Sequence, residues 1–139
     1  MSTRLVLLGA PAGFGKTTLV AQWRASAAES RPFAWVSLDR GDDDPGGLWW
    51  YVACALQRAC HQVAVEGILR ALRVADPKIT EEVLPVLINE IAALPAPVVL
   101  VLDDYYVITE RDCHEQVAFL LRHMPPSLQI VLILSLIHI

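Results

Sequence analysis

The chain has 139 residues, of which 55 % are hydrophobic and 19 % are charged. This length bounds the chain to one domain, and so apolar a composition argues against an intrinsically disordered protein. The formal net charge is −4 and the sequence has no run of lysine and arginine, so it provides no electrostatic case for nucleic-acid binding by this chain.

The cysteines and the two ends of the chain indicate a cytoplasmic protein without a membrane anchor. Cys54, Cys60 and Cys113 form no CxxC pair and are odd in number, which favours reduced thiols. The apolar run near the N-terminus is too short for a signal peptide. The apolar stretch at 128–139 is shorter than the about 20 residues that a membrane-spanning helix needs.

The first half of the chain predicts two strands and two helices. Continuous apolar runs favour buried parallel strands, and apolar residues at helical spacing favour amphipathic helices. In chain order we expect a strand at 4–9, a helix at 16–29, a strand at 33–38, a polar turn at 39–47 and a helix at 48–63. Residues 64–79 fit neither pattern.

The second half continues the alternation. A helix is predicted at 80–94, with Pro85 shortening or kinking its start. A strand at 98–102 follows, then a helix that Asp112 caps and that runs to about 123, and a strand at 129–134. Alternation of this kind predicts an α/β fold in which about four strands form a mostly parallel sheet with helices on both faces.

A phosphate-binding motif lies between the first strand and the first helix. Residues 10–17 read APAGFGKT, which is the Walker A pattern GxxxxGK[ST] except that Ala10 replaces the first glycine. In this motif the loop amides and a helix N-terminus face the phosphates, the lysine reaches the β- and γ-phosphates, and the hydroxyl ligates magnesium. The predicted nucleotide-binding residues are Ala12, Gly13, Phe14, Gly15, Lys16, Thr17 and Thr18, with Thr17 also a magnesium ligand.

Two consecutive acids end the third predicted strand. The sequence VVLVLDD at 98–104 fits the Walker B pattern, in which the acid holds magnesium directly or through water. The carboxyl ends of parallel strands meet at one edge, where α/β sheets bind their ligands. We therefore predict Asp103 as a magnesium ligand and Asp104 as the catalytic residue that orients or deprotonates the attacking water. The alternative is a pair of solvated loop acids.

Other polar and aromatic residues leave two interpretations open. Asp39 and the acids at 42–44 either sense magnesium or a polar substrate, or cap the helix that follows. Trp49, Trp50 and Tyr51 form either a stacking surface or part of the core. The four histidines have no metal-ligand spacing. Ser135 follows the fourth strand, at an end that faces the γ-phosphate in related folds.

Taken together, these motifs resemble the MalT-like, LuxR-type large ATP-binding regulators of the STAND class of P-loop ATPases. The resemblance extends through about residue 134 and is carried by APAGFGKTTLVAQW at 10–23, AWVSLDRGDDDP at 34–45, LINEIAALPAPVVLVLDDYYVI at 87–108 and FLLRHMPPSLQIVL at 119–132. It implies a P-loop NTPase three-layer sandwich in which the strand at 129–134 lies between the strands at 4–9 and 98–102. It also implies ATP and Mg²⁺ as cofactors, and an ATP-driven switch in a cytoplasmic transcription activator.

The resemblance further implies that residues 1–134 are a truncated, N-terminal nucleotide-binding domain with weak or no hydrolysis by itself. Family members usually have an arginine after the serine that ends the fourth strand, whereas Leu136 follows Ser135 here. The sequence SLIHI at 135–139 is unlike the family, and we interpret it as a truncation or read-through artefact. A DNA-binding module and nucleotide-dependent self-association are expected of the full-length protein, and no DNA binding is expected of this segment.

Two other functions stay open from the residues alone. A small P-loop kinase would need an arginine-bearing lid and an acceptor pocket, and no convincing lid is present in the sequence. A non-functional fragment of a larger ATPase would also be strongly apolar. The preference for ATP over GTP comes only from the resemblance, and a slow ATPase activity is the catalytic expectation.

Overall fold

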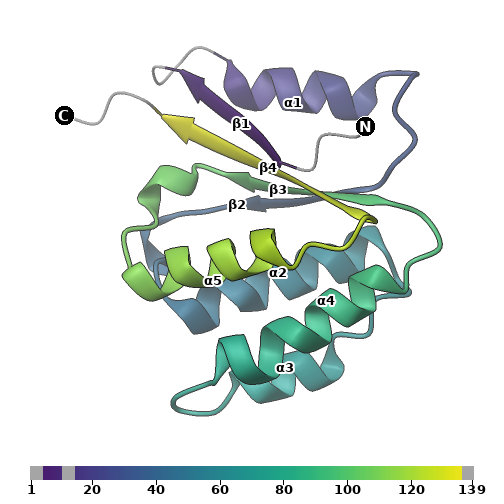
Figure 1. Cartoon of the computed structure of the whole chain (residues 1–139). Helices are drawn as coiled ribbons and strands as arrows, with labels where there is room; N and C mark the ends of the chain where they lie inside the picture. Colours follow the sequence, from purple (N-terminus) through teal and green to yellow (C-terminus); the bar gives the residue numbers. More distant parts are fainter. Residues whose placement is uncertain (1–4, 11–14, 136–139) are drawn as a thin grey trace.

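A single parallel sheet organises the computed structural model, which describes residues 5–10 and 15–135. Its strands are β1 (Leu5–Ala10), β2 (Phe33–Ser37), β3 (Val98–Asp103) and β4 (Leu128–Ser135), in the spatial order β1-β4-β3-β2 (Figure 1). The predicted α/β class is confirmed. β4 lies between β1 and β3, as the family resemblance implies.

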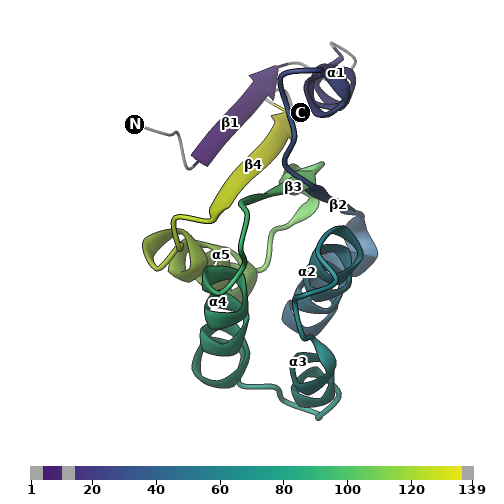
Figure 2. The ribbon, with the colours of Figure 1, turned by 90° about the vertical axis from the view of Figure 1, so that its right-hand side faces the viewer.

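Helices cover both faces of the sheet. Helix α1 (Lys16–Ala25) lies on one face, and α2 (Pro45–Ala59), α4 (Leu84–Ala92) and α5 (Arg111–Arg122) lie on the other (Figure 2). Helix α3 (Glu66–Leu72) packs beside α2, farther from the sheet. All six residues of β3 are buried because layers cover this strand on both sides, and this explains its unbroken apolar sequence.

The two faces carry cores of different size. The core on the α1 side is small and consists of Val20, Phe33, Val99, Val101, Val131 and Ile133. The opposite core includes Trp49, whose indole N–H donates a hydrogen bond of 2.8 Å to Gln116 Oε1 on α5. Trp49 is therefore part of the core, although Tyr51 on the same helix is exposed. Among the described helices, none is long and apolar enough to cross a membrane.

Several element boundaries differ from the sequence-based expectation. Helix α1 ends at Ala25 because Ser26 adopts an extended conformation, four residues before the predicted end. Part of the ambiguous region at 64–79 forms α3, and a π-helical turn at Ile79–Val83 precedes α4. Pro85 lies in the first turn of α4, where its missing N–H is tolerated.

The predicted cap of the helix after β3 was wrong. Helix α5 begins at Arg111, so Asp112 lies inside its first turn, and Glu110 is the N-cap residue without a side-chain cap bond. The carboxylate of Asp43, from the β2–α2 loop, instead accepts hydrogen bonds from the Thr109 and Glu110 N–H groups. A distant loop thus satisfies these amides, which local sequence spacing could not reveal.

Candidate nucleotide site

The carboxyl ends of the strands bring the predicted site residues to one edge of the sheet. β1 ends at Ala10, the first residue of the predicted phosphate-binding motif, and β3 ends at Asp103. Gly15, Lys16, Thr17 and Thr18 follow at the start of α1. The predicted ligands Ala12, Gly13 and Phe14 lie outside the described residues, as do residues 136–139 and the side chain of Ser135.

Gly15 sets the entry into α1. Its φ of 74° lies in the left-handed region, and its carbonyl accepts the N–H of Leu19 at 2.9 Å. A Cβ added at this position would meet no atom within 4 Å, so the backbone conformation, and not lack of space, requires glycine here. The turn leaves the first residues of α1, including Lys16, at the positive end of the helix dipole.

Thr17 and Asp103 meet across the site although they are 86 positions apart. The Thr17 hydroxyl donates to the two carboxylate oxygens of Asp103, at 3.2 Å from Oδ1 and 3.0 Å from Oδ2. The Asp103 residue is only 3 % exposed. A hydroxyl and a carboxylate side by side provide the oxygen ligands that Mg²⁺ prefers. The two residues that the sequence predicts as magnesium ligands therefore lie in contact.

Asp104, the residue that follows Asp103, has an unusual backbone conformation. Its φ is 57° and its ψ is 39°, in the left-handed region that residues other than glycine rarely adopt. Burial raises the pKa of the Asp104 carboxyl above its ordinary value, the neighbouring Asp103 raises it further, and Lys16 opposes both. Asp103 and Lys16 therefore act in opposite directions on the pKa of the Asp104 carboxyl.

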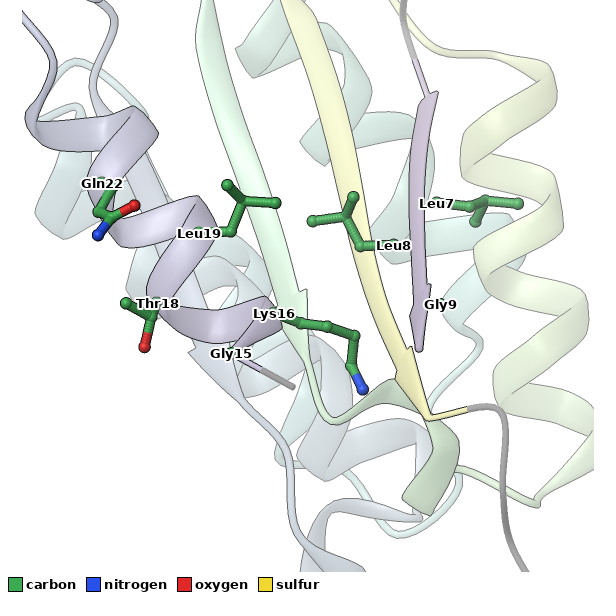
Figure 3. A pocket seen from close by; sticks show the side chains of 8 residues that line it. All are labelled: Leu7, Leu8, Gly9, Gly15, Lys16, Thr18, Leu19 and Gln22. Atoms are coloured by element: carbon green, nitrogen blue, oxygen red, sulfur yellow. The ribbon is translucent and has the colours of Figure 1, made fainter. Parts of the chain in front are cut away.

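A pocket of about 560 Å³ extends from Lys16 along the space between β1 and α1. Figure 3 shows the Lys16 side chain extending toward the carboxyl ends of β1 and β4, while Leu8 and Leu19 point toward each other across the gap. Thr18 and Gln22 add polar groups to the lining. Sequence reasoning did not identify Leu8, Leu19 or Gln22 as site residues, because no motif extends to them.

Most of the acidic residues in the turn after β2 accept capping hydrogen bonds from nearby backbone N–H groups. Asp39 and Asp42 accept each other's backbone N–H in a capping box around the 3-10 turn at Arg40–Asp42. Asp44 accepts the Gly47 N–H at 2.9 Å and caps α2. Of the two interpretations, the structure favours capping for these residues. Among the residues described, no group of three histidine, cysteine, aspartate or glutamate side chains gathers as a metal site.

Comparison with known proteins finds relatives of this chain among bacterial transcriptional regulators. Proteins named HTH-type transcriptional regulator MalT are similar to it over 132 residues: the protein of Cronobacter sakazakii at 39 % identity, that of Serratia proteamaculans at 38 % and that of Yersinia enterocolitica at 36 %. Each alignment covers 94 % of this chain but 14 % of the relative. No family model matches the chain. Over nearly its whole length, the chain is therefore a homologue of a segment of the MalT-like transcriptional regulators, as its motifs predict.

Proposed function

We propose that this chain binds a nucleoside triphosphate together with Mg²⁺, as the ATP-binding core of a STAND-type transcriptional regulator. The observation that carries the proposal is the contact of Thr17 with Asp103. The two residues come from separate motifs, one predicted to hold phosphate and the other magnesium. Their convergence beside Lys16 is what a magnesium–triphosphate site requires.

Magnesium fits the donor set of this site. Thr17 Oγ1 and the Asp103 carboxylate would hold the ion, which usually takes one or two protein ligands and completes its shell with water and phosphate oxygens. When bound, the ion neutralises charge on the β- and γ-phosphates. Gly15 and Lys16 lie at the N-terminus of α1, so amide donors, the helix dipole and the ammonium group all favour a polyphosphate there.

The pocket beside Lys16 provides room for the rest of the nucleotide. Its volume of about 560 Å³ lies in the usual range for small-ligand sites. Leu8 and Leu19 provide apolar walls, and Thr18 and Gln22 provide hydrogen-bonding groups. Asp104 orients or deprotonates the attacking water in a slow hydrolysis, for which its raised pKa is suited.

The relatives support a regulatory role more than a metabolic one. Their name describes transcriptional regulators with a helix-turn-helix, and this chain spans 14 % of their length. We place DNA binding in other parts of the longer protein, and we propose a cytoplasmic location and a switch function for the nucleotide site. The preference for ATP follows from the family resemblance.

The two lysines of the chain allow a matched test. Lys16→Ala removes the proposed phosphate contact, whereas Lys78→Ala removes an exposed lysine that lies before the π-helical turn. A hydrogen bond to a charged group is worth about 1.5–3 kcal/mol, which corresponds to roughly a 10- to 100-fold loss of affinity. Titration calorimetry with Mg-ATP should show this loss for Lys16→Ala and none for Lys78→Ala. Equal affinities in the two variants would contradict the proposal.

A further inference from the structure

The backbone of Asp104 needs support from its surroundings. A left-handed conformation at a residue other than glycine persists only where neighbouring contacts hold it. Asp104 begins the connection from β3 to α5, which contains a 3-10 turn at Tyr105–Val107 and ends at Glu110. Side chains from two other elements bind this connection, one near each of its ends.

The near end is held through Tyr105, the residue that follows Asp104. Its side chain packs in the core and is only 8 % exposed. The Tyr105 hydroxyl and His114 Nδ1 on α5 share a hydrogen bond of 2.8 Å, and the two rings meet edge to face at 5.4 Å. Burial raises the pKa of Tyr105 to about 12, so the hydroxyl keeps its proton at neutral pH.

The far end is held by Asp43 from the β2–α2 loop. Its Oδ1 accepts the Thr109 N–H at 3.0 Å and the Glu110 N–H at 2.9 Å, and its Oδ2 accepts the Thr109 hydroxyl at 2.6 Å. Asp39, Asp42 and Asp44 in the same loop all make capping bonds within their own segment. Asp43 differs from them because its bonds join the loop to the connection that begins at Asp104.

We propose that Tyr105, His114 and Asp43 are positioning residues for Asp104. They act by clamping both ends of the β3–α5 connection, which fixes the left-handed backbone of Asp104 and the direction of its carboxylate beside Lys16. The catalytic part of this inference rests on the proposed nucleotide hydrolysis. The conformational part does not, since it concerns the protein without nucleotide.

A test on the free protein uses two neighbouring tyrosines. Tyr105→Phe removes only the hydroxyl that binds His114, while Tyr106→Phe removes a hydroxyl from an exposed side chain on the same turn. The backbone chemical shifts of Asp104 in the nuclear magnetic resonance spectrum report its left-handed conformation. We expect these shifts to move away from wild-type values in Tyr105→Phe and to stay in Tyr106→Phe. Unchanged Asp104 shifts in Tyr105→Phe would overturn the proposal.

Conservative substitutions test whether the hydrogen bonds of His114 and Asp43 are what hold the Asp104 backbone. An asparagine at 114 can place a hydrogen-bonding atom close to the position of the histidine Nδ1, and an asparagine at 43 keeps an oxygen for the two backbone N–H groups. We expect His114→Asn and Asp43→Asn to retain wild-type shifts at Asp104, and His114→Ala and Asp43→Ala to lose them. Loss in the asparagine variants equal to that in the alanine variants would contradict the hydrogen-bonding role.

Measurements of ATP turnover and of Mg-ATP affinity then distinguish a positioning role of these residues from a general loss of structure. Misplacement of a catalytic group by about 1 Å can cost up to about 100-fold in rate, so we expect Tyr105→Phe and Asp43→Ala to lower ATP turnover at least about tenfold. Their affinity for Mg-ATP should stay within about twofold of wild type, because Lys16, Thr17 and Asp103 are untouched. Unchanged turnover would overturn the positioning role. A wild-type chain that binds no triphosphate would instead overturn the proposed function, and the Asp104 shifts would still decide the conformational claim.

Discussion

The pKa of Asp104 depends on burial and on two neighbouring charges of opposite sign. Burial and Asp103 disfavour its ionised form, while Lys16 favours it. Asp104→Asn removes the basic oxygen but nearly preserves the size of the side chain. We expect the variant to bind Mg-ATP with nearly wild-type affinity and to turn it over more slowly, because a general base contributes about 10²–10⁴-fold to rate. Single-turnover hydrolysis measures the effect, and an unchanged rate would remove the base role.

The ion pair between Glu29 and Arg31 predicts how the stability of the fold depends on pH. Its carboxylate makes a two-point pair with Arg31, and hydrogen bonds from this guanidinium are the largest cause that lowers the pKa of Glu29 from 4.5 to about 2. A lowered pKa in the folded state means that the pair stabilises the fold above pH 4.5 and that this contribution is lost as the pH falls toward 2. Urea unfolding of wild type should therefore show a stability that declines over this range.

The matched variants distinguish this pair from an exposed one. Glu29→Gln should flatten the decline, since the pair that depends on the charge is gone. Glu115→Gln breaks the surface pair with Arg111 and should leave the pH profile as in wild type, because the Glu115 side chain is 60 % exposed while that of Glu29 is 9 % exposed. The same acid decline in Glu29→Gln as in wild type would contradict this assignment.

At the scale of elements, helix α2 depends on its cap. Asp44 accepts the Gly47 N–H, and Pro45 occupies the first turn. Asp44→Ala should lower the free energy of unfolding by about 1 kcal/mol, and Asp44→Ser should recover most of this loss because serine also caps well. Urea unfolding at neutral pH checks both. Equal stabilities of the alanine and serine variants would show that the cap contributes little.

The elements that the sequence predicted best are those set by local pattern. The strand at 98–102 was predicted because five apolar residues lie between a proline-rich breaker and two acids, and β3 extends it by one residue to Asp103. The region at 64–79 could not be predicted, because the short α3 packs against α2 and against the π-helical turn at Ile79–Val83, with which the helix predicted from residue 80 begins. The start of α5 was also missed, and the N–H groups of Thr109 and Glu110 just before it are bound by Asp43, a contact over 66 positions for Thr109.

At the scale of the whole molecule, the candidate site likewise has parts that local sequence patterns predicted and parts that depend on contacts between distant residues. The motifs predicted Lys16, Thr17, Asp103 and Asp104 as site residues because motif spacing reflects a local backbone geometry. Parallel topology predicted that the two motifs would share one edge of the sheet. The Tyr105–His114 bond and the clamp by Asp43 lay beyond sequence reasoning, since no periodicity reports which side chains meet between layers. Asp43 lay in an acidic run for which capping of the next helix was the more usual interpretation and magnesium or substrate sensing the alternative, and neither of them includes its bonds to Thr109 and Glu110.

The proposed function of the whole molecule depends on a triphosphate and a magnesium ion that meet at Thr17 and Asp103. The most direct measurement is therefore the affinity for ATP, by titration calorimetry, with Mg²⁺ and with EDTA, in wild type, Thr17→Ser and Thr17→Val. We predict that Mg²⁺ strengthens binding in wild type and in Thr17→Ser, which keeps the hydroxyl, and that this gain is lost in Thr17→Val. An equal gain in Thr17→Val, or no dependence on Mg²⁺ in wild type, would contradict a magnesium–triphosphate site at these residues.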